Sequence, residues 1–127
     1  MLKQRTLRNP IKATGIGLHT GRNINMELHP AEPNSGISFI RTDVCKKTII
    51  PAIAENVGDT SLSTALIKDN IKISTIEHLL SAIAGLGVDN CIIMVDGPEV
   101  PIMDGSSSPF DFLIQSAGLE DQNVLKK

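Results

Sequence analysis

Apolar and polar residues alternate through the first half of the chain, a pattern typical of strands with one buried face. The alternation runs from Ile24 to Leu28 and again from Gly36 to Ile40, on either side of turn residues at 32–35. An isoleucine-rich stretch follows at 48–57. We expect a strand in each of these three segments.

Two shorter runs, at 63–68 and 71–73, are separated only by Asp69 and Asn70. Both residue types tolerate the positive φ that a two-residue hairpin turn requires. The pattern therefore predicts a β-hairpin.

The period of the pattern becomes helical after residue 74. The residues Ser74-Thr75-Ile76-Glu77 have the form of a capping box, which opens helices. The apolar residues that follow at helical spacing are Ile76, Leu79, Leu80 and Ile83. Gly85 and Gly87 predict the end of this helix. A second helix is predicted from Ser108-Pro109 to Gly118.

A continuous apolar run at 91–95 predicts a strand buried on both faces. With the run at 71–73 and the first helix it forms a strand–helix–strand unit, whose strands we expect to be parallel. The fold class is therefore α+β, a two-layer sandwich in which a mixed β-sheet carries two helices on one face. We expect this domain to span residues 1–119, and the polar residues 120–127 to begin a linker.

Composition narrows the possible functions. The chain has 127 residues with 41% hydrophobic residues, enough for one globular domain. A net charge of −2, no basic run and only 2% aromatic residues argue against nucleic-acid partners. No apolar run approaches the roughly 20 residues of a transmembrane segment.

The two cysteines, Cys45 and Cys91, form no spaced pair. They predict neither a disulfide framework nor a cysteine zinc site, and they suit the reducing cytoplasm. Cys91 lies in an apolar run, and we expect it to be a core residue.

Candidate chemistry lies at Glu77 and His78, in the first turn of the first helix just past a strand. The helix dipole favours a carboxylate at Glu77 and a neutral imidazole at His78. These are the forms that a general base and a metal ligand need. Other interpretations remain open, because Glu77 is also the acidic member of the capping box. A single helical histidine is also typical of surface or packing residues.

The face of this helix opposite the apolar stripe is predicted to carry Glu77, His78, Ser81 and Ala82. A solvated face normally carries long charged side chains, whereas Ser81 and Ala82 are small and permit close approach. We therefore expect a second domain or a ligand to cover this face.

Residues 15–21 are rich in glycine but do not match a phosphate-binding fingerprint followed by a helix. One interpretation is a tight connection between strands. The other is a backbone that lets a ligand approach, with His19 at the rim of the site.

At Ile73–Leu79 the sequence resembles the Glu-His segment of the UDP-3-O-acyl-N-acetylglucosamine deacetylases. Further matching blocks occur in the same order along nearly the whole chain. They are Lys3-Gln4-Arg5-Thr6, Gly15 to Gly21, Arg41-Thr42-Asp43, Gly85 to Asn90, and Pro101 to Ser106.

The resemblance implies a zinc-dependent enzyme that removes the N-acetyl group from a UDP-linked, 3-O-acylated glucosamine in lipid A synthesis of Gram-negative bacteria. His78 would be a zinc ligand, and Glu77 the general base that takes a proton from the attacking water. Leu62 and Ser63 match a loop that lines the site, where many family members have Cys in place of Ser63. Independently of the resemblance, the glycine-rich segment leads us to expect that His19 contributes to substrate binding.

The resemblance also implies two similar domains with the active site between them. The other two zinc ligands, a His and an Asp, would lie in the second domain, so we expect the chain alone to be inactive. Two alternatives are a stand-alone α+β binding module and a nucleotide-binding α+β fragment of another class.

Overall fold

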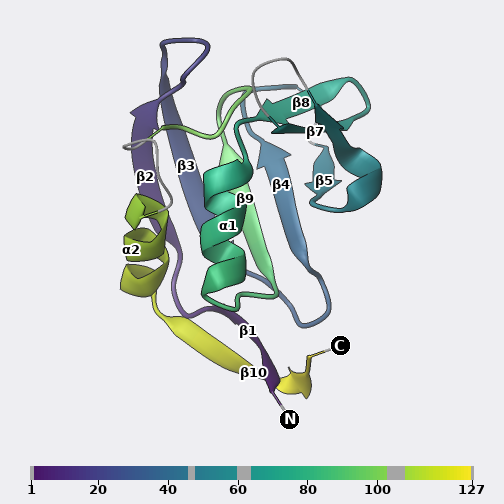
Figure 1. The fold of residues 1–127 in the computed structure, drawn as a ribbon, viewed down its shortest axis with the longest axis vertical. Helices are drawn as coiled ribbons and strands as arrows, with labels where there is room; N and C mark the ends of the chain where they lie inside the picture. The colour runs from purple at the N-terminus through teal and green to yellow at the C-terminus, as the bar shows by residue number, and fades with distance from the viewer. Residues whose placement is uncertain (1, 46–47, 60–63, 103–107, 127) are drawn as a thin grey trace.

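The computed structural model describes residues 2–45, 48–59, 64–102 and 108–126. Helices α1 (Glu77–Gly85) and α2 (Ser108–Ala117) lie on one face of a five-stranded mixed sheet (Figure 1). This arrangement confirms the predicted α+β sandwich. The positions of both helices are also confirmed, and Gly87 and Gly118, with φ of 70° and 85°, follow their ends.

The main sheet has the strand order β2-β3-β9-β4-β5. Its strands are β2 (Ile11–Ile16), β3 (Asn23–Pro30), β9 (Cys91–Val95), β4 (Ile37–Arg41) and β5 (Ile49–Pro51). All neighbouring pairs are antiparallel except β4 and β9, which are parallel. Strands β3 and β4 confirm the first two predicted strands, and in β3 the residues Ile24, Met26 and Leu28 alternate into the core as expected.

A second sheet contains β6 (Val57–Asp59), β7 (Thr64–Lys68) and β8 (Ile71–Ser74) in that order. The β7–β8 hairpin confirms its prediction, with φ of 52° at Asp69 and 65° at Asn70. The single strand expected at 48–57 is wrong, because β5 ends at Pro51 and the 3-10 helix η1 (Ala54–Asn56) precedes β6. The Asn56 amide donates to the Pro51 carbonyl at 2.8 Å and stabilises this turn.

The predicted parallel pairing of residues 71–73 with 91–95 is also wrong. Both edges of β9 are occupied, by β3 on one side and β4 on the other. Strand β8 pairs instead with β7, and an isolated parallel bridge between Ser74 and Glu99 connects it to the chain beyond β9.

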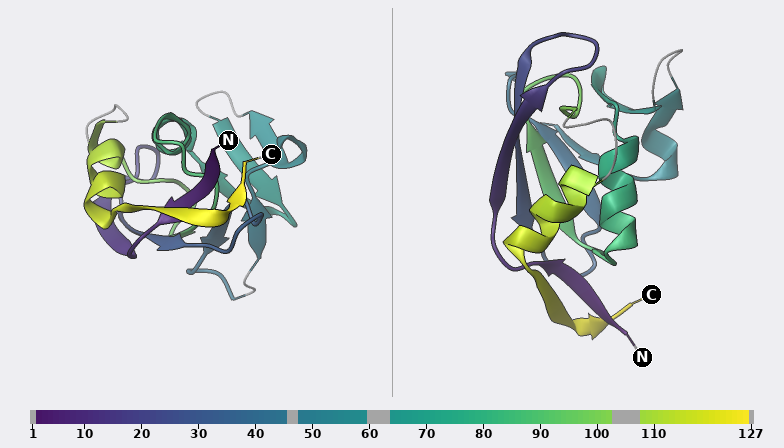
Figure 2. Two further views of the ribbon diagram at one scale, coloured as in Figure 1. Left: turned by 90° about the horizontal axis from the view of Figure 1, so that it is seen from below. Right: turned by 60° about the vertical axis from the view of Figure 1, so that its left-hand side comes forward.

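Residues 119–125 form a strand, β10 (Leu119–Leu125), in the place where we expected a linker to begin. Strand β10 pairs antiparallel with β1 (Lys3–Leu7) at one end of the molecule (Figure 2). Gln122 of this strand also bonds to residues outside β1: its side-chain amide donates to the Ala31 carbonyl at 2.8 Å. Asn90 donates to Gln122 at 2.7 Å.

The core lies between the helices and the main sheet, and it is almost entirely aliphatic. Its largest fully buried side chains include Phe39, Leu79, Ile93 and Ile114. Neither described helix has the length and apolarity needed to cross a membrane.

The two thiols should differ sharply in reactivity. Cys91 is buried, and burial raises the pKa of its thiol to about 12, whereas Cys45 is exposed. Because thiolate is the reactive form, a thiol reagent at pH 8 should label one cysteine quickly and the second only after unfolding. Cys45→Ser should abolish the fast phase. Fast labelling that survives Cys45→Ser would contradict the buried position of Cys91.

Candidate functional site

Glu77 and His78 form the first turn of α1, as predicted, with Glu77 exposed and His78 half-buried. The predicted capping box is wrong. The N-cap is Ile76, without a side-chain cap, because Ser74 belongs to β8 and its N–H donates to the Pro98 carbonyl at 2.8 Å. The Glu77 carboxylate instead accepts the N–H of Thr64 at 3.0 Å. This bond orients the carboxylate without capping its own helix.

The backbone just before this turn is strained at Thr75, which has φ of 61°. A β-branched residue seldom adopts this left-handed conformation, which costs about 1–3 kcal/mol. Thr75 is buried, and its N–H donates to the Thr64 carbonyl at 3.0 Å. Among the residues that the structure describes, its hydroxyl oxygen has no partner. Such strain clusters at functional sites.

The outer face of α1 differs from the predicted one at Ala82. Ala82 is buried, because it lies one turn after Leu79 on the core side, and the exposed residues are Glu77, Ser81, Ala84 and Gly85. The exposed face nevertheless has only small residues after Glu77. On the neighbouring α2, the Phe112 side chain is 70% exposed.

The glycine-rich segment connects β2 to β3, which confirms the strand-connection interpretation. Gly17 donates to the Arg22 carbonyl at 2.8 Å, and Gly21 has φ of 69°. The connection and the start of α1 lie at the same end of the molecule (Figure 1). His19, in this connection, is exposed.

The structure therefore places His19, Glu77 and His78 at one end of the molecule. Leu62 and Ser63, predicted to line the site, lie outside the described residues. Within the described ranges, no group of three His, Cys, Asp or Glu residues could hold a metal ion.

One residue near this end was not recognised in the sequence. Glu99 is only 1% exposed, and its carboxylate accepts backbone N–H groups of His19 and Thr20 at 2.9–3.2 Å. A sequence signal existed, because Glu99 stands in the otherwise apolar segment 98–102. A carboxylate in such a segment must find partners when it is buried.

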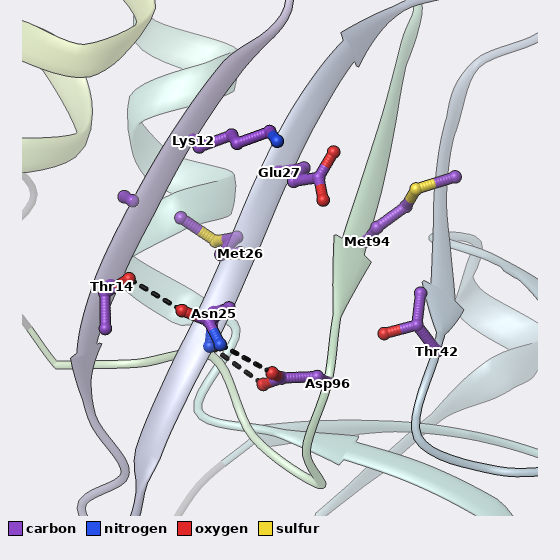
Figure 3. Close-up of a pocket in the computed structure, with 9 residues that line it drawn as sticks. Lys12, Thr14, Asn25, Met26, Glu27, Thr42, Met94 and Asp96 are labelled. Carbon is purple, nitrogen blue, oxygen red and sulfur yellow. Dashed lines mark hydrogen bonds between the residues drawn. The ribbon is translucent and has the colours of Figure 1, made fainter.

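A groove of about 370 Å³ lies on the face of the main sheet opposite the helices, away from these residues (Figure 3). Its polar side chains bond one another: Thr14 donates to Asn25, and Asn25 donates to Asp96 at 2.8 Å. It contains none of the predicted site residues.

Arg41 and Asp43 form a bidentate ion pair at the end of β4, with N–O distances of 2.6 and 3.0 Å. The hydrogen bond from Arg41 lowers the pKa of the Asp43 carboxyl. Arg41 also donates to the Lys72 carbonyl at 3.4 Å. The pair thus connects the main sheet to β8, the strand that leads into α1.

The sequence profile of the family described as LpxC, UDP-3-O-acyl N-acetylglycosamine deacetylase, matches residues 4–127. The chain is 59% identical to the UDP-3-O-acyl-N-acetylglucosamine deacetylase of Methylococcus capsulatus and 61% identical to that of Saccharophagus degradans. It is 58% identical to the protein of the same name from Coxiella burnetii. Each match covers all 127 residues of this chain but 42% of the relative.

The Arg41–Asp43 pair should make stability depend on pH in the acid range. Because the pKa of Asp43 is lowered on folding, the pair stabilises the fold above pH ~3.9, the usual value for Asp. This contribution is lost as the pH falls through the folded-state pKa. Asp43→Asn should reduce the free energy of unfolding by about 1 kcal/mol at pH 7. The difference should shrink below pH ~4 in urea titrations.

The matched control is Asp121→Asn, which breaks the more exposed pair between Arg5 and Asp121. At pH 7, Asp121→Asn should reduce the free energy of unfolding by clearly less than Asp43→Asn. The prediction would be contradicted if both variants reduced the free energy of unfolding equally, or if the reduction for Asp43→Asn did not change with pH. Either result would show that the Arg41–Asp43 pair does not stabilise the fold more than an exposed pair does.

Proposed function

Because this chain belongs to the UDP-3-O-acyl N-acetylglycosamine deacetylase family, we propose that it is the amino-terminal part of a zinc-dependent hydrolase. In the proposed reaction, the enzyme hydrolyses the N-acetyl group of UDP-3-O-acyl-N-acetylglucosamine. This is a step of lipid A biosynthesis in Gram-negative bacteria. The observation that carries the proposal is the Glu77-His78 pair in the first turn of α1.

The donor set suits a zinc site that is shared with another part of a longer protein. A catalytic zinc takes three protein ligands, and no trio of candidate ligands occurs in the described part of this chain. His78 would supply one imidazole. The chain spans 42% of the length of its relatives, and we expect the remaining His and Asp ligands in the other part.

Glu77 is suited to the role of general base. Its carboxylate is exposed, so water can reach it, and the Thr64 N–H fixes one of its oxygens. When bound, zinc supplies a Lewis acid that polarises the amide carbonyl. Glu77 takes the proton from the water that attacks this carbonyl. His19 and the loop with Leu62 and Ser63 would contact the substrate.

The exposed face of α1 is the proposed contact for the second domain. Ser81, Ala84 and Gly85 are exposed and carry no charge, and Phe112 projects from the adjacent α2. Burial of these uncharged residues and of the Phe112 ring by a second domain would be favourable. Glu77 lies at the start of this exposed face, so a domain that packed on the face would also cover the candidate site.

We also propose that the protein acts in the cytoplasm. Cys45 and Cys91 are both free thiols, which suits a reducing compartment. The stand-alone binding module remains the second candidate function, and the two experiments below separate it from the enzyme.

In the full-length protein, Glu77→Gln should reduce deacetylation by about 10²–10⁴-fold, because the base is removed. The thermal midpoint should hardly change, because a glutamine oxygen can still accept the Thr64 N–H. Acetate release and thermal unfolding measure the two effects. The control is Glu55→Gln, at an exposed position in η1. Retained activity, or a loss fully matched by lost stability, would favour the binding module.

The isolated chain should fold but should not retain stoichiometric zinc after dialysis, because it supplies only one of three ligands. Adding the remaining part of the protein should restore both zinc, measured by atomic absorption, and activity. Tight stoichiometric zinc in residues 1–127 alone would contradict the shared site.

A further inference from the structure

The Glu99 carboxylate is almost completely buried, with 1% exposure. Burying a charge is costly unless it is hydrogen-bonded. Among the described residues, its partners are backbone amides and not a Lys or Arg side chain. The His19 N–H lies 3.1 and 3.2 Å from the two carboxylate oxygens, and the Thr20 N–H lies 2.9 Å from Oε2. Hydrogen bonds to a charged acceptor are stronger than neutral ones.

The connection between β2 and β3 is shaped to accept this carboxylate. A Cβ atom at Gly17 would lie 2.7 Å from Glu99 Oε2 and would also clash with the Thr20 hydroxyl. Glycine therefore permits the close approach. The Gly21 N–H donates to the Gly17 carbonyl at 2.9 Å and closes the turn around it.

The segment that carries Glu99 is also fixed to the start of α1. The Ser74 N–H donates to the Pro98 carbonyl at 2.8 Å, and the Val100 N–H donates to the Ser74 carbonyl at 2.9 Å. Ser74 is followed by the strained Thr75 and then by the first turn of α1. Residues 98–100 thus contact the entry to α1 through their backbone and the glycine-rich connection through the Glu99 side chain.

We propose that Glu99 is a positioning residue that fixes the connection carrying His19 relative to Glu77 and His78. Its effect on catalysis passes through His19, whose backbone it holds while the imidazole remains exposed. This inference rests on the proposed function for its catalytic consequence, whereas its structural part can be tested without activity.

The structural part predicts slow exchange of two amide protons in the full-length protein. Those of His19 and Thr20 should exchange with solvent more slowly than that of Leu18, although all three side chains are exposed. Glu99→Gln should weaken this protection, because glutamine carries no negative charge and replaces one of the two oxygens that the His19 N–H contacts with an NH2 group. Equal exchange at all three positions in the unmodified protein would overturn the proposal, whether or not the protein is a deacetylase.

The catalytic part predicts a split between kinetic constants. Glu99→Gln should raise KM for the UDP-linked substrate by about tenfold or more and lower kcat by less, because a charge-assisted positioning contact is lost. In a His19→Ala background, the same substitution should change KM by less than about twofold, because coupled residues are non-additive. An equal KM change in both backgrounds would overturn the proposal. Glu120→Gln, at an exposed position on β10, is the matched control.

Gly17→Ala provides a second test that leaves the charge of Glu99 intact. The added methyl group crowds the carboxylate, so this variant should also raise KM and release the His19 and Thr20 amides. If Glu99→Gln does not fold, the Gly17→Ala variant tests the proposal instead. Unchanged KM and unchanged amide exchange in Gly17→Ala would overturn it. An unmodified full-length protein without deacetylase activity would overturn the proposed function, and the exchange experiment would still decide the role of Glu99.

Discussion

The hydrogen bonds between Ser74 and the segment at residues 98–100 determine how the candidate site is assembled. They attach the end of β8, which belongs to the small sheet, to the chain that leaves β9 in the main sheet. Helix α1 starts three residues after Ser74, so these bonds determine where Glu77 and His78 lie. The small sheet is also joined to the main sheet by packing, because Leu66 of β7 and Ile73 of β8 are fully buried in the common core.

This attachment explains how the chain maintains a strained residue. Thr75 lies between the Ser74 bonds and the Glu77 contact to Thr64, and its own N–H is bonded to the Thr64 carbonyl. A left-handed threonine persists only where the surroundings fix it on both sides. The left-handed conformation of Thr75 sets the direction in which the chain enters α1.

The proposed shared site would lie on an open side of the fold. The space between the helices and the main sheet is filled by the buried core. The outer face of α1 and the Phe112 side chain are exposed. Glu77 and His78 belong to this open side. In the enzyme that we propose, a second part of the protein would cover this side and supply the other zinc ligands, so that substrate binding and zinc binding would depend on the same contact.

The sequence by itself determined the features of the fold that depend on residues close together in the chain. The period of apolar residues determined both helices and the strands β3, β4 and β9, and Asp69 and Asn70 determined the β7–β8 hairpin, because these signals act within a few residues. The Glu77-His78 pair and the glycine-rich connection were visible for the same reason. The tertiary structure alone decided which strands pair, because β9 bonds to β3 and β4, which are distant in the chain. It also decided that residues 119–125 pair with β1, that Ala82 is buried, and that Glu99 binds His19 and Thr20 some 80 residues away. Contacts at such separations depend on competition among all partners in the folded chain, and no local pattern encodes the outcome.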